Sequence, residues 1–304
     1  MRFSVVIVTY NRRDLLLGCL RAVADLDYPD YEIVVADDGS TDGSLEAVRR
    51  QFPQARCLPH PVNTGEAAAR NRGVRAAAGD IIAFTDDDCL VPRDWLQRHA
   101  RHYTDPRVAA AGGPQICRSP TFYDSFDAAQ WTIRFDRLET IECIRSYEHL
   151  LTGSMSVRRE VCERVGPFDE QFLRGCDSDF IRRLSRAGYP FVRDPDLQVD
   201  HLKVHAFLPY LWFRFQRALG SLLIDVKEGT LSTRRFVPVP NVRQTQDNWR
   251  RFRKSRGRGP LLWARFWGLA LLTRVVDVMG RSYYYWTVGR RYRPPALQPK
   301  RMNP

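Results

Sequence analysis

Three adjacent carboxylates, Asp86, Asp87 and Asp88, follow the apolar run at 81–84. Two like charges about 4 Å apart repel each other by about 4 kcal/mol when the effective dielectric constant is about 20. A fold keeps such a cluster only where solvent, a cation or a positive side chain relieves the repulsion. Mg²⁺ and Mn²⁺ prefer oxygen ligands and also bind phosphates, so the triplet predicts either a divalent-metal site or a solvated acidic turn.

The elements around the triplet predict the edge of a parallel sheet. Strand-like apolar runs alternate with segments of helical periodicity, which indicates an α/β fold with a mainly parallel sheet. The predicted strands are 3–8, 32–36, 55–58 and 80–85, and the predicted helices are 15–26, 44–51 and 66–79. Ligands bind beyond the carboxyl ends of the strands in such sheets. The polar turns at 9–12, 37–42 and 86–88 all fall there, so we expect them to line one site.

Patterns beyond the triplet extend this fold. The predicted helices are 92–103, 160–165 and 177–187, and the predicted strands are 108–116, 152–157 and 192–199. The aromatic stretch 121–150 is expected to be irregular or helical. As a loop beside a site, it would carry part of the specificity.

Composition limits the class of protein. The chain of 304 residues is 44% hydrophobic, enough for a packed core. Its seven Cys are odd in number and no CxxC occurs, so we expect reduced thiols in a cytoplasmic protein rather than a disulfide framework or a structural zinc site. A strand-like run begins at Arg2 and leaves no room for a signal peptide. Neither GxGxxG nor GxxxxGK[ST] is present, which argues against a dinucleotide-binding fold and a P-loop ATPase.

Charge is divided unevenly along the chain. Residues 1–201 carry 26 Lys and Arg against 31 Asp and Glu, a balance of −5, whereas residues 202–304 carry 21 against 4, a balance of +17. We therefore expect a globular domain at 1–205 and a basic, mainly helical region at 206–304. An anionic membrane surface or a nucleic acid would complement the charge of the second region.

The basic region begins with an amphipathic pattern. Residues 207–224 have helical periodicity with a separate polar face. The polar positions are Arg214, Arg217, Ser221 and Asp225. Such a helix lies on a membrane or packs against the catalytic domain. The polar, Arg-rich stretch 229–259 predicts a loop or linker.

Residues 261–279 are almost long enough to span a bilayer, but Arg265, Arg274 and Asp277 interrupt them. The two arginines lie about 180° apart around a helix, which excludes a clean apolar stripe. A charge at the bilayer centre costs about 2.5–3.5 kcal/mol, so we expect an interfacial helix rather than a spanning one. The aromatic and arginine residues at 283–293 suit the headgroup region. Together these features predict a peripheral protein on the inner face of the cell membrane.

An ordered set of motifs resembles the family 2 glycosyltransferases, which have a GT-A fold. The set consists of TYNR after the first strand, DDGSTD after the second, NTG before an Ala-rich helix, the DDD triplet, GSMSVRR, FDE, GCDSDF and a downstream His. The resemblance covers about residues 1–205. It implies inverting transfer of a sugar from a nucleoside diphosphate sugar, with UDP favoured as the nucleotide. The acceptor would be a hydroxyl of a lipid-linked, glycan or other cell-envelope molecule.

The resemblance implies that Mg²⁺ or Mn²⁺ bridges the triplet and the donor diphosphate. Asp86 and Asp88 match the metal-binding carboxylates, and Asp87 is a candidate contact to the sugar or ribose. The metal would neutralise charge on the departing nucleoside diphosphate. His201 matches a His that completes the coordination, and His205 is its competitor.

The same resemblance assigns the first loop and the DDGS turn to the base and ribose. The matching loop residues are Thr9, Asn11 and Arg12. Asp38 would accept a hydrogen bond from N3–H of uracil or thymine, although its turn also suits capping of the next helix. Gly65 would let the backbone approach the nucleotide closely.

Inverting transfer needs a carboxylate that removes the proton of the acceptor hydroxyl. The family motif is an acidic pair after a Gly, and Gly175-Cys176-Asp177 has Cys at the first acidic position. Asp177 is therefore the expected base, with Gly175 and Cys176 beside it on the acceptor side. A nucleophilic Cys176 is disfavoured because no activating His lies nearby in sequence. Asp179 is the alternative base on this side, or it orients an arginine one turn later in the helix.

Two functions without catalysis stay open. The basic region would serve nucleic-acid binding, since 283–293 combines arginine with aromatic residues, but no known binding motif occurs. A degenerate transferase would bind nucleotide without turnover. The sequence does not identify the sugar, the nucleotide, the acceptor, the linkage or the oligomeric state.

Overall fold

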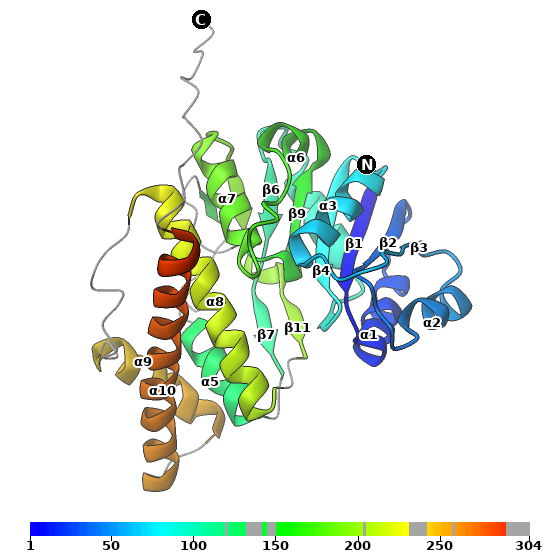
Figure 1. Ribbon diagram of the computed structural model, residues 1–304. Coiled ribbons are helices and arrows are strands. Elements are labelled where there is room, and N and C mark those ends of the chain that lie inside the picture. Colours follow the sequence, from blue (N-terminus) through cyan, green and yellow to red (C-terminus); the bar gives the residue numbers. More distant parts are fainter. Residues whose placement is uncertain are drawn as a thin grey trace, which may run out of the picture.

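The computed structural model describes residues 1–118, 121–131, 142–144, 150–202, 205–230, 242–256 and 259–289. A twisted sheet with helices on both faces is followed by a group of packed helices (Figure 1). Predictions for residues 132–141 and 290–293 fall outside the described residues.

The large sheet has eight strands in the order β3-β2-β1-β4-β9-β6-β10-β8. Its strands are β1 (Phe3–Thr9), β2 (Tyr31–Asp37), β3 (Arg56–Leu58), β4 (Ile81–Asp86), β6 (Ala110–Gly112), β8 (Glu142–Ile144), β9 (Met155–Arg158) and β10 (Phe191–Arg193). Strands β1 to β4 are parallel, and β9 is antiparallel to both β4 and β6. The predicted α/β fold with a mainly parallel sheet is confirmed.

Alternation along the strands buries both faces of this sheet. Val5 and Ile7 of β1 belong to one apolar core, and Val6 between them belongs to the other. Buried parallel strands carry such continuous apolar runs because helices cover both faces. The first core is covered by α1 (Arg13–Ala24), α2 (Ser44–Gln51) and α4 (Trp95–His102), and the second by α3 (Glu66–Ala76), α6 (Arg159–Val165) and α7 (Cys176–Arg186).

A second, three-stranded sheet adjoins the acidic triplet. Its order is β5-β11-β7, formed by β5 (Cys89–Leu90), β11 (Val199–His201) and β7 (Gln115–Cys117). The register places His201 opposite Cys89. This pairing carries a histidine from late in the chain to the triplet.

The strand predicted at 108–116 is wrong as a single element. It divides into β6 of the large sheet and β7 of the small sheet, on either side of Gly113-Pro114. A Cβ added at Gly113 would lie 2.6 Å from the backbone of Leu197, so the chain turns there in close contact with another segment. The helix predicted at 66–79 also ends early, at Ala76.

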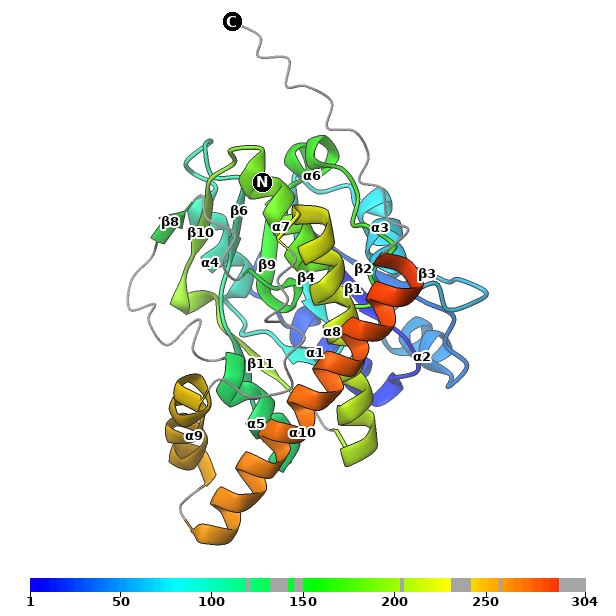
Figure 2. The same ribbon diagram turned by 60° about the vertical axis from the view of Figure 1, so that its left-hand side comes forward.

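The carboxyl-terminal helices are α8 (Phe207–Glu228), α9 (Val242–Arg256) and α10 (Pro260–Tyr284), with a short π-helical turn at Tyr285–Gly289. They enclose a third core together with α5 (Phe122–Trp131). Figures 1 and 2 both show α8 and α10 side by side. The helices expected at 207–224 and 261–279 are confirmed as elements. The loop expected at 229–259 is wrong for 242–256, because these residues form α9 and Phe252 is buried against Phe266 of α10. Residues 231–241 and 257–258 of that stretch fall outside the described residues.

Part of the polar face of α8 is buried inside this group. Nη2 of Arg214 lies 2.6 Å from Oδ2 of Asp277 in α10, and its Nη1 lies 3.3 Å from Oδ1 of Asp127 in α5. Arg281 of α10 donates to Asp225 of α8 at 3.1 Å. Two roles were expected for this helix, lying on a membrane or packing against protein. The contacts of Arg214 and Asp225 show the second for this part of the polar face. Among the described residues, no helix combines the length and apolar character needed to cross a membrane.

Replacing Gly220 by Ala tests how α8 meets the loop that leads into α7. A Cβ added at Gly220 would overlap the carbonyl oxygen of Arg174, so we expect Gly220→Ala to lower the free energy of unfolding by about 1–3 kcal/mol. Gly268→Ala in α10 is the matched control. A Cβ there meets no described atom within 4 Å, and Ala favours a helix interior by about 0.5–1 kcal/mol over Gly. Urea denaturation measures both, and equal stability of the two variants would contradict this packing.

Candidate active site

One cleft of about 1680 Å³ opens where β1, β2 and β4 end. Thr9, Asp38 and Asp86 line it, one from each of these strand ends or the turn that follows. The three polar turns therefore meet at one edge of the sheet, as expected for ligand sites in parallel α/β folds. From there the cleft continues past Asp177 to residues of α8 and α9.

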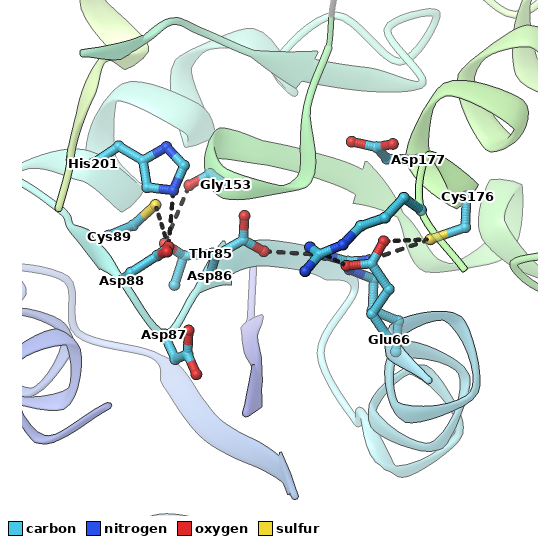
Figure 3. A network of polar contacts seen from close by, with 12 residues as sticks. Glu66, Thr85, Asp86, Asp87, Asp88, Cys89, Gly153, Cys176, Asp177 and His201 are labelled. Atoms are coloured by element: carbon cyan, nitrogen blue, oxygen red, sulfur yellow. Dashed lines mark hydrogen bonds and ion pairs between the residues drawn. The ribbon is translucent and has the colours of Figure 1, made fainter. Parts of the chain in front are cut away.

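Four side chains could hold a cation at the end of β4. The ligand atoms of Asp86, Asp88, Cys89 and His201 all lie within 4.8 Å of one another. Nε2 of His201 is 2.9 Å from Oδ1 of Asp88, and Figure 3 shows this contact. His205, the competitor, instead lies beside Asp124 of α5.

The chemistry of this group suits Mg²⁺ or Mn²⁺. Two carboxylates and an imidazole are ligands that Mn²⁺ accepts, and carboxylates suit both ions. Burial raises the pKa of the Cys89 thiol well above its ordinary value, and the charge of Asp88 adds to this. The thiol therefore stays protonated, and a neutral sulfur is a poor ligand for a hard cation. Asp86, Asp88 and His201 fit the metal, whereas Cys89 does not.

Asp87 joins the triplet to the first loop. It is buried, and its two oxygens accept hydrogen bonds from Oγ1 of Thr9 at 2.9 Å and Nη1 of Arg12 at 3.1 Å. Burial raises the pKa of Asp87 to about 7; Arg12 opposes this shift and Asp88 adds to it. Thr9 and Arg12 therefore hold the triplet against β1. Contact of Asp87 with the sugar or ribose stays a prediction.

Positive side chains relieve the repulsion within the triplet. Arg12 contacts both Asp87 and Asp88 at 3.1 Å. Burial disfavours its charged form, but these carboxylates outweigh that effect and raise the pKa of Arg12. Asp86 pairs with Nη2 of Arg70 at 3.1 Å. The triplet is therefore not a solvated acidic turn.

Groups of the protein itself already donate hydrogen bonds to both oxygens of the Asp38 carboxylate. Its carboxylate accepts hydrogen bonds from the backbone and hydroxyl of Thr64, from N–H of Gly65 and from Arg72, at 2.7–3.0 Å. Burial alone would raise the pKa of Asp38, but the hydrogen bonds from Thr64 and Arg72 outweigh it and lower that pKa. The observed role is to fasten the turn after β2 to the start of α3. Its contact with the base stays a prediction.

Asn11 and Gly65 have special backbone conformations beside the cleft. Asn11 has a φ of 51°, and its Oδ1 accepts a hydrogen bond from N–H of Thr41 at 2.7 Å. It thus ties the first loop to the turn after β2. Gly65 has a φ of 95°, a region that favours glycine. A Cβ there would meet no described atom within 4 Å, so the space beside it is open.

Asp177 lies at the start of α7 and lines the cleft. It is half-buried, and N–H of Ser178 donates to its Oδ1 at 2.7 Å. Burial raises the pKa of Asp177; Arg70 opposes the shift, and Glu66 and Asp86 add to it. Figure 3 places Asp177 and Cys176 at the opposite end of the group from Asp88. A carboxyl with a raised pKa in a cleft suits proton transfer.

Cys176 was expected on the acceptor side of the site, and the structure does not place it there. It is fully buried in the second core and does not line the cleft, although Gly175 before it does. Nη1 of Arg70 lies 3.2 Å from its sulfur, and burial raises the pKa of the thiol well above its ordinary value. Cys176 therefore faces Arg70 and not a substrate.

Asp179 is also displaced from the acceptor side. It is buried away from the cleft. Its Oδ2 accepts from Nε of Arg183 at 2.8 Å, and Nζ of Lys227 lies 3.1 Å from its Oδ1. The expected pairing with an arginine one turn later is confirmed. Burial away from the cleft argues against the alternative role of Asp179 as the base.

Arg70 is the residue that the sequence interpretation missed. It is buried and contacts Asp86, Cys176 and, at 3.6 Å, Glu66. It thereby joins the acidic triplet to the start of α7, which carries Asp177. A signal was present: Glu66 and Arg70 are spaced i, i+4 on the helix whose first turn follows the NTG motif.

Known proteins resemble this chain in sequence. A family model described as Glycosyl transferase family 2 matches residues 4–166, just over half of the chain. Glycosyltransferase AglE of Haloferax volcanii is 34% identical over 192 residues, which are 61% of this chain and 62% of that protein. Pre-mycofactocin glycosyltransferase of Mycobacterium tuberculosis is 30% identical over 211 residues, which are 65% of this chain and 42% of that protein. The matched segments span less than two thirds of either relative's length.

Solved structures share the fold. Mannosyltransferase PcManGT from Pyrobaculum calidifontis, in complex with GDP-Man and Mn²⁺, has a TM-score of 0.65 at 23% identity, over 94% of this chain and 88% of that one. S. aureus TarS 1–349 in complex with UDP has a TM-score of 0.57 at 16% identity, over 96% and 92% of the two chains. At these identities the likeness concerns the GT-A fold. On the match of the family model, the chain belongs to glycosyl transferase family 2.

Proposed function

We propose that this glycosyltransferase is an inverting, metal-dependent enzyme that moves a sugar from a UDP-sugar to a hydroxyl of a lipid-linked, glycan or other cell-envelope acceptor. The observation that carries the proposal is the arrangement of one cleft. Asp86, Asp88 and His201 are grouped at one end, and Asp177 lies further along it. The known complexes of PcManGT with GDP-Man and Mn²⁺ and of TarS with UDP support a nucleotide-sugar donor.

The proposed reaction exchanges one bond for another at the anomeric carbon. The acceptor oxygen forms a bond to that carbon, the bond to the diphosphate oxygen breaks, and the acceptor proton moves to a carboxylate oxygen of Asp177. Asp86, Asp88 and His201 would hold Mg²⁺ or Mn²⁺, which neutralises charge on the departing UDP. Arg12 and Arg70 keep these carboxylates in position through their ion pairs.

The nucleotide would occupy the part of the cleft between the ends of β1 and β2. Thr9, Asp38 and Gly65 line this part. Open space beside Gly65 supports close approach of the diphosphate to the backbone. Asn11 and Arg12 would act by holding the loop that bounds it.

Removing one metal-binding carboxylate tests the donor end. We expect Asp88→Asn to abolish Mn²⁺-dependent binding of UDP, because the cation would lose a negative ligand. The matched control is Asp94→Asn, which changes an exposed carboxylate paired with Arg98. Isothermal titration of UDP with and without Mn²⁺ measures the effect. Unchanged, Mn²⁺-dependent affinity in Asp88→Asn would refute the assigned site.

Asp177→Asn tests the base. A general base contributes about 10²–10⁴-fold to the rate, so we expect kcat/KM to fall by about that factor at neutral pH while UDP binding persists. In the unmodified enzyme, activity depends on ionised Asp177 and rises with pH through its pKa. Since that pKa is raised, the acid limb of the profile should lie above the ordinary Asp value of about 3.9. Full activity of Asp177→Asn would show that another group takes the proton.

An apolar stripe on α10 supports the proposed place on an anionic membrane surface. Exposed apolar side chains recur along one face of α10 and the turn after it: Leu261, Leu271, Leu272, Val275, Met279, Tyr283 and Trp286. A helix of 25 residues is about 37 Å long. Within α10, Arg265 is the one charged residue that is exposed, and it packs over the ring of Phe122.

Two of the three charges expected to interrupt this stripe do not do so, because Arg274 is half-buried and Asp277 points inward to Arg214. Arg265 is the exposed exception. The apolar surface continues onto α8, where exposed Trp212 stacks on Phe215. Such a surface next to a region of net charge +17 suits the boundary between acyl chains and anionic headgroups.

Acidic substitutions on the stripe test membrane binding. We expect Val275→Glu combined with Met279→Glu to weaken binding to phosphatidylglycerol vesicles at least about tenfold, since burying one large apolar side chain contributes about 1.5–3 kcal/mol. The control is Val242→Glu, on an exposed apolar residue of α9 away from the stripe. Vesicle co-sedimentation measures both. If the two proteins bind equally well, the stripe is not the membrane contact.

A further inference from the structure

The cleft is larger than its donor end requires. Small-molecule sites occupy about 300–1,000 Å³, whereas this cleft measures about 1680 Å³. The additional space lies beyond Asp177, between the start of α7, one face of α8 and α9. Figure 2 shows α9 beside α5, with α8 behind α10. This end has no assigned ligand, and under the proposed function it is where an acceptor would enter.

The wall contributed by α9 is cationic. Arg251, Lys254 and Arg256 line the cleft. The one carboxylate of this helix, Asp247, instead pairs with Arg250 outside the cleft. Arg256 donates to Oγ of Ser125 and to the carbonyl of Thr121, which holds α9 against α5. Within the described part of the chain, Lys254 makes no hydrogen bond or ion pair, and it is exposed.

Two carboxylates at this end, Asp127 and Asp225, pair with arginines of α8 and α10. Asp127 accepts from both Arg214 and Arg217, so two guanidinium groups share one of its oxygens. Asp225 pairs with Arg281. Burial, with Arg214 nearby, lowers the pKa of Arg217 to about 10 despite Asp127, and a bound anion would reverse that shift.

We infer that this end of the cleft, bounded by Arg217 of α8 and by Arg251, Lys254 and Arg256 of α9, binds an acceptor that carries phosphate. The inference rests on the proposed function, since it supplies the substrate class for the same reaction. Arginine and lysine bind phosphate oxygens through charge-assisted hydrogen bonds. The phosphate would belong either to a prenyl-type lipid or to a polyol phosphate chain, and both present the same group to the wall.

Binding of phosphate probes to this end of the cleft is measured in the presence of saturating UDP and Mn²⁺. The donor end is then occupied and cannot bind the probes. One arm uses a prenyl monophosphate in detergent micelles, with the prenyl alcohol as its neutral counterpart. The other uses a soluble poly(glycerol phosphate) oligomer, with glycerol as its neutral counterpart. We expect at least one phosphate probe to bind in preference to its neutral counterpart. Preference in the first arm alone identifies a lipid phosphate, and preference in the second identifies a polyol phosphate.

Substitutions in α9 test whether phosphate binding depends on the cationic residues of this helix. We expect Lys254→Glu to weaken phosphate binding about tenfold, because the wall would lose one charge-assisted hydrogen bond to the phosphate. Lys254→Arg should keep the affinity. Arg243→Glu makes the same charge change on an exposed residue of α9 that does not line the cleft, and should have no effect.

Three results would overturn the inference: no preference for phosphate in either arm, unchanged affinity in Lys254→Glu, or tighter binding of single-stranded DNA than of both phosphate probes. UDP affinity in the presence of Mn²⁺ is measured for every variant. If UDP binds normally while the phosphate probes fail, the acceptor inference alone is wrong. If UDP does not bind either, the proposed function fails with it.

Discussion

Repulsion among Asp86, Asp87 and Asp88 is the constraint around which the site is built. Each carboxylate meets positive or polar partners: Arg70 holds Asp86, Thr9 holds Asp87, and His201 contacts Asp88, while Arg12 contacts both Asp87 and Asp88. These partners come from α3, the first strand and loop, and β11. The cost of gathering three charges is thus met by joining distant segments of the chain. The same contacts leave Asp86 and Asp88 facing the cleft, where a cation would complete the neutralisation.

Local patterns in the sequence were sufficient for the first half of the fold. Apolar runs and helical periodicity predicted β1 to β4, and these strands place three polar turns at one edge. They could not reveal that Asp38 is saturated by Thr64 and Arg72, because hydrogen-bond satisfaction depends on tertiary contacts. Arg70 and Cys176 lie 106 residues apart, and no periodicity links them.

The carboxyl-terminal region misled sequence interpretation for a related reason. Helix α9 is strongly polar in composition, and only its contacts with α5 and α10 make it a helix with a buried face. Arg214 and Asp277 resembled charges facing solvent or lipid, yet each neutralises the other inside the helical group. Once these charges are turned inward, α10 presents an apolar stripe outward and α9 presents cations to the cleft. One packing arrangement thus produces both the proposed membrane contact and the proposed acceptor wall.

The central claim is that the acidic end of the cleft binds a nucleotide-sugar through a divalent cation. A thermal-shift panel of nucleoside diphosphate sugars, each with and without Mn²⁺, tests it most directly. A ligand at about 100 times its Kd stabilises the native state by about 2.7 kcal/mol. A UDP-sugar should raise the unfolding temperature only when Mn²⁺ is present. If no nucleotide-sugar raises it, with or without the metal, the claim is contradicted.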